Sequence, residues 1–478
     1  EAEETPAAGQ SCPMANGTTT GKRAPTAELM EKLAKKVAAI AAIYLVEKGV
    51  AQGLNKAKLK IPSSLATMLL WLGGLKAVEQ FHSAHAADSI AAHLSPGVGF
   101  LGKWMTLFLT PPLTMLPVAI KRNAKGTSAQ SWQRLVLIHA VGWVVSVLVS
   151  SALAKALSRR QEGDEEEVKE AAEASEAGTR SEEARTPPAA PGRAAPEEDP
   201  LLSNWVKIAA AAYMLQSTVG RKPAFAATTI TAIIAAQKAN PSLPKPVGSV
   251  AHPLVVAAIV TGVSLFLSAK AHGIPPEQLF DEYMNGKGPI GGGAGDAVAA
   301  LMNGAVSALG IRMFQARAIL EENWQPLAAG ASAVALVSLF GTAAAAGYSE
   351  LPPPLGLALS QRSVMSALGM AGANMLGASP NLAVASILLT GVYGAALGGG
   401  FLDWLGLKSP KDAVSRGVVM GASSHAIGTA SLMAREPEAA AVSSVSLCLT
   451  GIVHTAVLSI PAVQRFVHRL VRSTTGAS

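Results

Sequence analysis

The 478-residue sequence has few charged side chains. Asp, Glu, Lys and Arg make up 15% of it, whereas ordinary globular proteins carry about a quarter. A soluble enzyme of this length needs much more polar surface, so the composition argues against one. Half of the residues are hydrophobic but only 5% are aromatic, and Gly and Ala are abundant. This combination is typical of closely packed transmembrane helices.

Cysteine is also scarce. Cys12 and Cys448 share no spacing that suggests a disulfide framework or a metal site. A histidine-bearing loop lacks a familiar zinc spacing; it contains Glu79, His82, His85, Asp88 and His93. The glycine-rich stretch 291–296 follows no strand pattern, which argues against a phosphate loop. We therefore expect no metal, no cofactor and no enzyme activity.

The charges that are present lie unevenly along the chain. Residues 161–200 hold thirteen acidic and four basic side chains, and the remainder of the chain is basic. The Lys and Arg residues lie at the ends of apolar runs, where they contact lipid phosphates and set orientation. We expect a lipid bilayer as the partner, and no nucleic acid.

Apolar segments long enough to span a bilayer recur along the chain. They lie at about 34–54, 61–78, 98–120, 134–157, 201–218, 224–238, 251–271, 296–315, 326–347, 381–405 and 441–461. Two further stretches, 355–371 and 413–434, are rich in Gly, Ala or Ser and read as broken or re-entrant helices. The sequence thus predicts an all-α polytopic membrane protein of about twelve transmembrane helices, including two broken or re-entrant ones.

The domain organisation follows from these patterns. We expect a disordered N-terminal tail at 1–33, a four-helix membrane module at 34–157 and an acidic, Pro-rich linker at 158–200. A transport module at 201–465 and a basic C-terminal tail at 466–478 complete the chain. Within segment 98–120, Pro111, Pro112 and Pro117 predict a kinked or broken helix that other helices cover.

The first broken stretch contains an arginine that needs an explanation, since Arg at the centre of a spanning helix costs about 2.5–3.5 kcal/mol. A carboxylate ligand would supply one. On a helix Arg362 and Ser366 share a face, with Ser363 adjacent. The alternative is that Arg362 lies at the interface and snorkels to water.

The second broken stretch reads SRGVVMGASSHAIGTASL. Its residues 417, 421, 424 and 428 form one flat face, which suits either binding or close helix packing. Ser424 and His425 point about 100° apart on a helix, so they cannot form a nucleophile and base pair. Ser423, Ser424, His425 and Thr429 are candidate binding residues, and His425 is also a candidate for proton coupling.

Three polar residues precede these stretches. Asp296 is predicted to cap the helix that begins near it, with ion or proton coupling as the sharper alternative. Asn303 and Ser307 are four residues apart and could both face inward, either toward a substrate or in an interhelical hydrogen bond.

Several blocks resemble a known family. SRGVVMGASSHAIGTASLMAREPEA, SQRSVMSALGM and GAGDAVAALMNGAVSALGIRMFQARAIL resemble the LrgB/CidB membrane family, in particular its plant and algal branch, the plastidal glycolate/glycerate translocators. VAHPLVVAAI and CLTGIVHTAVLSIPAVQ fit the same order. KLKIPSSLATMLLWL and LTPPLTMLPVAI resemble a smaller LrgA partner fused in front. The resemblance covers about 34–157 and 201–465.

The resemblance implies an antiporter of the chloroplast inner envelope membrane that exchanges glycolate and glycerate. We expect a secondary transporter of small 2-hydroxycarboxylates that works by alternating access, as a homodimer. The alternative is a holin-like pore or lytic regulator. The expected substrate-binding residues are Asn303, Arg362, Ser363, Ser366, Ser423, Ser424, His425 and Thr429, and the candidates for proton coupling are His425 and Asp296.

Overall fold

The computed structural model describes residues 25–59, 61–123, 127–175, 220–240, 243, 251–432 and 436–472, and no strand occurs among them. The predicted span 201–218 lies outside this part of the chain. The first half forms α1 (Pro25–Lys56), α2 (Ser63–Phe81), α3 (Ala84–Lys103), α4 (Met105–Thr114), α5 (Leu116–Asn123) and α6 (Ala129–Ser175).

The second half continues with shorter helices and two π-helical turns, η3 and η4. In order, these elements are α9 (Arg221–Ala239), α11 (Pro253–Ala271), α12 (Pro276–Tyr283), α13 (Gly288–Gly291), α14 (Ala294–Val298), η2 (Ala299–Leu301), α15 (Met302–Gln315), α16 (Arg317–Glu322), α17 (Trp324–Leu336), η3 (Val337–Gly341), α18 (Thr342–Tyr348), α19 (Pro353–Leu359), α20 (Ser366–Met375), α21 (Pro380–Tyr393), η4 (Gly394–Gly398), α22 (Gly399–Trp404), α23 (Ala413–Leu432), α24 (Pro437–Leu458) and α25 (Pro461–Arg472).

The described residues contain seven helical stretches that are long and apolar enough to cross a membrane. These are Leu29–Lys56, Ala129–Leu157, Pro253–Ala271, Ala294–Gln315, Trp324–Tyr348, Pro380–Trp404 and Pro437–Leu458. The protein is therefore an all-α polytopic membrane protein, as the sequence predicts. The expected total of about twelve transmembrane helices stays a prediction.

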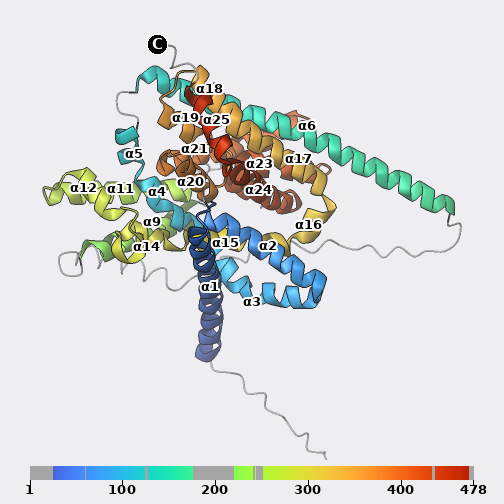
Figure 1. The fold of residues 1–478 in the computed structure, drawn as a ribbon, viewed down its shortest axis with the longest axis horizontal. Coiled ribbons are helices and arrows are strands. Elements are labelled where there is room, and N and C mark those ends of the chain that lie inside the picture. The colour runs from blue at the N-terminus through green and yellow to red at the C-terminus, as the bar shows by residue number, and fades with distance from the viewer. Residues whose placement is uncertain are drawn as a thin grey trace, which may run out of the picture.

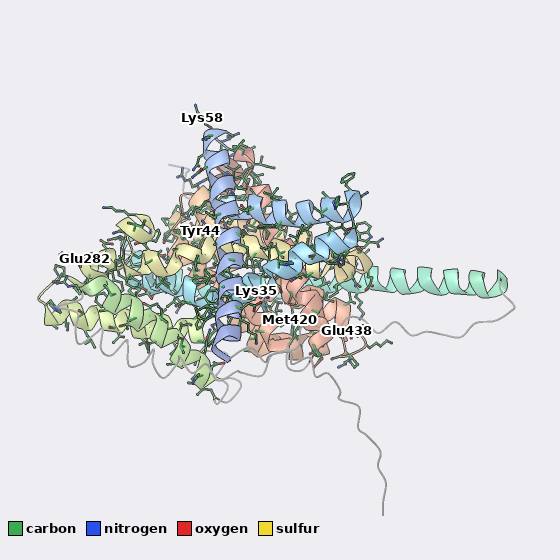
Figure 2. All side chains as sticks on the ribbon, turned by 90° about the horizontal axis from the view of Figure 1, so that it is seen from below. Lys35, Tyr44, Lys58, Glu282, Met420 and Glu438 are labelled. Atoms are coloured by element: carbon green, nitrogen blue, oxygen red, sulfur yellow. The ribbon has the colours of Figure 1, made fainter. Side chains whose placement is uncertain are left out.

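Helices from the two halves of the chain share their packing. α2 packs on α15, where Gly310 lies against the Met68 backbone, and α6 packs on α17 and α23. Figure 1 shows α6 as a long helix that crosses the helical body and extends beyond it. Figure 2 follows α1 through Lys35 and Tyr44, with Lys58 just beyond its end, and shows Glu282 on one side of that helix and Glu438 on the other.

The proline-containing segment is broken and covered, as predicted. The helix is interrupted at Trp104, between α3 and α4, and again at Met115, between α4 and α5. Pro117 is the second residue of α5. Every residue from 108 to 115 is buried. Burial in protein allows the neighbouring helices to cover the backbone groups that Pro111 and Pro112 leave unpaired.

Both stretches that were predicted as broken helices are broken. The first consists of α19 and α20, which are separated by the turn Ser360–Met365. The second is α23, whose helical geometry is interrupted at His425, with φ 43° and ψ −142°. A non-glycine residue with positive φ is strained, and such strain costs about 1–3 kcal/mol and clusters at functional sites.

The end of the described chain differs from the expected tail. Residues 466–472 belong to α25, which packs by Val467 and Val471 against α18 and α19. The reason is the amphipathic pattern of PAVQRFVHRLVR, which places apolar side chains on one face and Arg465 and Arg469 on the other. Similarly, α1 begins at Pro25, inside the range expected as an N-terminal tail.

The glycine face of α23 serves helix packing in its first half. A Cβ atom at Gly417 would meet the Ala439 carbonyl oxygen of α24, and one at Gly421 would overlap the Ser443 carbonyl oxygen. Ser446 also donates a hydrogen bond from Oγ to the Val418 carbonyl oxygen, at 2.8 Å. Close backbone approach therefore fixes α23 against α24.

We expect Gly421→Ala to destabilise the protein by about 1–3 kcal/mol, because the added methyl group forces α23 away from α24. The measurement is the unfolding temperature of the purified protein in detergent. Gly53→Ala in α1 is the matched control, since a Cβ there meets nothing within 4 Å. Equal unfolding temperatures for the two variants would contradict the packing role.

Candidate substrate-binding site

One helix of the first half connects the two breaks. On α6, Gly142 accepts a hydrogen bond from Arg362 in the first break, and the next residue, Trp143, donates one to Ser424 beside the second. Arg362 and Ser424, which belong to the two distinctive polar blocks and are 62 residues apart in the chain, therefore meet consecutive residues of α6. We call the residues at this meeting point the central polar cluster: His139, Gly142, Trp143, Ser146, Thr342, Arg362, Ser363, Ser386, Ser424 and His425.

Arg362 is fully buried and is held by two helices. Its Nη2 donates to the Gly142 carbonyl oxygen at 2.7 Å and to Ser146 Oγ at 2.9 Å. Its Nε donates to Thr342 Oγ1 at 3.0 Å. Three of the five N–H donors of the guanidinium are thus used, and they fix its position and plane.

The remaining two donors of Arg362 lie on Nη1, which is buried and has no hydrogen-bond partner. The hydroxyl of Ser363 is also buried and has no hydrogen-bond partner. Within the described residues no carboxylate pairs with this guanidinium. A buried cation without a counter-ion is costly, so the site is one that an anion would stabilise.

Arg416, near the start of the other broken helix, shows the opposite arrangement. Its Nε and Nη2 donate to the Glu436 carboxylate at 2.5 and 2.6 Å, and its Nη1 donates to Asp403 Oδ1 at 2.7 Å. Two carboxylates neutralise this guanidinium, so it locks the entry of α23 in place. Arg362 alone of the two keeps its positive charge available.

The close approach of Arg362 to α6 depends on a glycine. A Cβ atom at position 142 would lie 2.9 Å from both Cζ and Nε of Arg362. Any side chain there would push the guanidinium away from Ser146. Gly142 is therefore part of the site although it contributes only its carbonyl oxygen.

The second break is held from two sides. Trp143 Nε1 donates to Ser424 Oγ at 3.0 Å, and His425 Nε2 lies 2.8 Å from the Ile387 carbonyl oxygen of α21. Because a carbonyl oxygen only accepts, this contact assigns the proton to Nε2. These bonds compensate part of the backbone strain at His425.

α21 also contacts the cluster through the residue before Ile387. The Ser386 carbonyl oxygen and Oγ lie 2.8 and 3.1 Å from His139 Nε2 on α6. On the far side of the first break, Gln361 Oε1 lies 3.0 Å from His454 Nε2 on α24.

The two π-helical turns, η3 and η4, both lie next to the central polar cluster. η3 ends directly before Thr342, which binds Arg362, and Gly394, the first residue of η4, packs against Ser424. Single π turns inside α-helices occur frequently at functional sites because they re-aim the residues around them. Two breaks and two π turns thus converge on the central polar cluster.

Some predicted residues lie elsewhere. Ser366 begins α20 and is only partly buried; it does not share a helix face with Arg362, because the chain is not helical between 360 and 365. The predicted pairing of these two side chains on one face is therefore wrong. Asn303 is exposed, whereas Ser307 is buried and bonds to the Gly304 carbonyl oxygen, so the two do not face inward together.

Three further candidates are engaged in local bonds. Asp296 accepts backbone N–H groups from Asn285, Gly286 and Gly293 at 2.8–3.0 Å, which confirms its capping role at α14. Ser423 Oγ donates to the Val419 carbonyl oxygen. Thr429 Oγ1 donates to the His425 carbonyl oxygen and lies 2.7 Å from Ser443 Oγ on α24.

The histidine-bearing segment is helical rather than a loop from Ala84 onward, because α3 begins there with Ser83 as its N-cap. Its acids are ion-paired: Glu79 and Asp88 both bind Arg317. The hydrogen bond from Lys76 lowers the pKa of the Glu79 carboxyl, with Arg317 acting in the same direction. These groups connect α2 and α3 to α16.

Several site residues were not identified from the sequence. His139, Gly142, Trp143 and Ser146 lie at spacings of three, one and three on α6, which places them on one helix face. This spacing is a usable signal inside an apolar span. Thr342, Gln361 and Ser386 carry no local signal, since each acts through a contact with a distant helix.

We expect Glu436→Gln to lower stability by about 3 kcal/mol, because it leaves the buried Arg416 guanidinium with one partly exposed carboxylate, Asp403, and the Leu407 carbonyl oxygen. Asp403→Asn is the matched control: Asp403 is 52% exposed, so its loss should cost no more than about 1 kcal/mol. Thermal unfolding in detergent measures both. Equal unfolding temperatures would show that Glu436 does not anchor α23.

The chain is similar in sequence to several known proteins. Residues 229–463 match the LrgB-like family. Plastidal glycolate/glycerate translocator 1 of Arabidopsis thaliana is 23% identical over 460 residues, which cover 94% of this chain and 83% of the relative. Holin-like protein CidB of Staphylococcus epidermidis is 32% identical over 124 residues, covering 26% of this chain and 52% of the relative.

A second bacterial relative, holin-like protein CidB of Staphylococcus aureus, is 24% identical over 212 residues, covering 44% of this chain and 85% of the relative. No solved structure matches the chain. The family match and the long alignment to the plant protein agree with the helical fold and the predicted blocks. Residues 229–463, slightly less than half of the chain, therefore resemble the LrgB-like family, and they follow a front helical region in a polytopic membrane protein.

Proposed function

We propose that the protein is a secondary transporter that exchanges small 2-hydroxycarboxylates, glycolate and glycerate, by alternating access. The observation that carries the proposal is Arg362: a fully buried guanidinium in a broken membrane helix, with Nη1 unpaired. An anionic substrate would supply the missing partner. The name of the Arabidopsis relative, a plastidal glycolate/glycerate translocator, supports this substrate class and a location in the chloroplast. We propose the inner envelope membrane as the location.

The proposed binding mode follows from the free donors. A substrate carboxylate binds the two N–H groups on Nη1 of Arg362, and the hydroxyl of Ser363 binds the same carboxylate or the 2-hydroxyl group. α20 begins four residues after Arg362, so its N-terminal end adds partial positive charge nearby. Ser424 and His425 complete the proposed site from the second break, where Ser424 bonds to Trp143, the residue after Gly142.

Burial of the central polar cluster supports a carrier rather than an open pore. Arg362, Ser424 and His425 are between 0 and 3% exposed. A site in this state is closed to water from both sides, which is the occluded state that alternating access requires. Broken helices that meet at buried polar groups are the usual construction of such carrier sites.

We expect Arg362→Lys to weaken glycolate uptake about tenfold to a hundredfold in apparent affinity, because Lys cannot keep the bonds to Gly142, Ser146 and Thr342 and bind a carboxylate at the same time. Uptake of labelled glycolate into proteoliposomes measures this. Arg465→Lys, on the exposed face of α25, is the matched control and should leave affinity unchanged. Parental affinity in a folded Arg362→Lys protein would rule out this binding role.

Kinetics separate a carrier from a pore. A carrier must reorient with substrate bound, so unlabelled glycerate inside the vesicles should accelerate entry of labelled glycolate, and uptake should saturate. Vesicles without internal substrate are the control. Flux that rises linearly with glycolate concentration and ignores internal glycerate would favour the holin-like pore instead.

A further inference from the structure

A small, partly open cavity lies next to the central polar cluster, with His139 and Ser386 of the cluster in its wall. It has a volume of about 150 Å³ and is bounded by α5, α6, α19 and α21. Since one water occupies about 30 Å³, the cavity has room for roughly five waters. A larger apolar groove of about 880 Å³ shares Leu116, Ala385 and Leu389 with it, so the two spaces adjoin.

The cavity wall is apolar except at its inner side. His139 of α6, 1% exposed, and Ser386 of α21, 8% exposed, stand together there and are hydrogen-bonded to each other. His139 Nε2 donates to the Ser386 carbonyl oxygen, because that oxygen only accepts. The Ser386 hydroxyl accepts from the same nitrogen, so its own proton is available to another acceptor. A buried hydroxyl with a free proton at the wall of a cavity suits a ligand hydroxyl group.

The cavity is close to the proposed carboxylate site. His139 and Gly142, which binds Arg362, are three residues apart on α6, a rise of about 4.5 Å. Leu359 lines the cavity three residues before Arg362, and the two are joined by a backbone hydrogen bond of 3.1 Å. The cavity and the carboxylate site therefore lie about one helical turn of α6 apart.

We infer that this cavity receives the distal carbon of a three-carbon hydroxy acid, with His139 and Ser386 binding its terminal hydroxyl while the carboxylate binds Arg362. The inference rests on the proposed function and adds its size and charge selection. Glycolate leaves the cavity to water, whereas glycerate places its hydroxymethyl group there. The wall that the structure describes contains neither Lys nor Arg, so a second carboxylate would be buried without a counter-ion.

Two competitors test the charge selection. Wild-type protein in proteoliposomes takes up labelled glycolate while unlabelled glycerate or hydroxymalonate is added outside. Hydroxymalonate has the same carbon count as glycerate but carries a carboxylate at the distal position. We expect glycerate to compete at least tenfold better. Equal competition by the two acids would overturn the inference, because the cavity would then accept charge.

Two variants test the size selection. Ala385→Leu adds three carbons to the cavity wall and should weaken glycerate competition at least tenfold more than it weakens glycolate uptake. Ala456→Leu, at an exposed position of α24, is the matched control and should change neither. Ser386→Ala, which adds no volume, should weaken glycerate about threefold to tenfold more than glycolate through the lost hydrogen bond. If Ala385→Leu does not fold, the Ser386→Ala variant alone tests whether the cavity binds glycerate.

Failure of this inference is distinguishable from failure of the proposed function. If wild-type uptake depends on Arg362 but both cavity variants keep the parental ratio of glycerate to glycolate affinity, the cavity role is wrong and the carboxylate site stands. If wild-type vesicles show no saturable glycolate uptake, or Arg362→Lys leaves it unchanged, the proposed function and the cavity role fall together.

Discussion

The rest of the structure depends on how Arg362 is held. A guanidinium inside a bilayer costs about 2.5–3.5 kcal/mol, and this one has no carboxylate partner among the described residues. Three of its donors are satisfied by Gly142, Ser146 and Thr342, which requires α6 to approach without a side chain at position 142 and α18 to follow a π turn. The helix break supplies the geometry, since a continuous helix would not leave Arg362 between α19 and α20. The unusual features of this region therefore have one common physical cause.

The two buried arginines, Arg416 and Arg362, have different roles in the two broken helices. Arg416 is neutralised by Glu436 and Asp403 and holds α23 at its entry, so its contribution is stability. Arg362 is positioned by neutral groups, which fix its direction but leave its charge uncompensated. A carboxylate beside Arg362 would stabilise the empty protein and compete with any anion that binds. The absence of such a group from the described surroundings of Arg362 is consistent with a site meant for an exchangeable ligand.

Local patterns predicted those features that depend on the chain's own sequence. Pro111 and Pro112, the small residues near 355–371 and 413–434, and Asp296 all act on their own segment, so the broken segments and the α14 cap could be predicted. The partners of Arg362 and Ser424 could not, because Gly142 and Trp143 lie more than 200 residues away along the chain. The spacing on α6 marks a polar helix face but does not tell which distant residues that face contacts. The pairing of Arg362 with Ser366 was wrong for a related reason. It assumed a regular helix at the position where tertiary contacts unwind one.

The position of α6 also bears on how such proteins are assembled. The family match covers residues 229–463, yet the groups that bind Arg362 Nη2 and Ser424 lie at 142–146. In the Staphylococcus aureus relative, 212 aligned residues make up 85% of the whole protein. That relative is therefore too short to contain both regions. A protein that kept Arg362 and Ser424 but lacked residues 142–146 would have to satisfy these groups with a second polypeptide or with water. When both regions are part of one polypeptide, they do not have to find each other in the membrane. They are also made in a ratio of one to one.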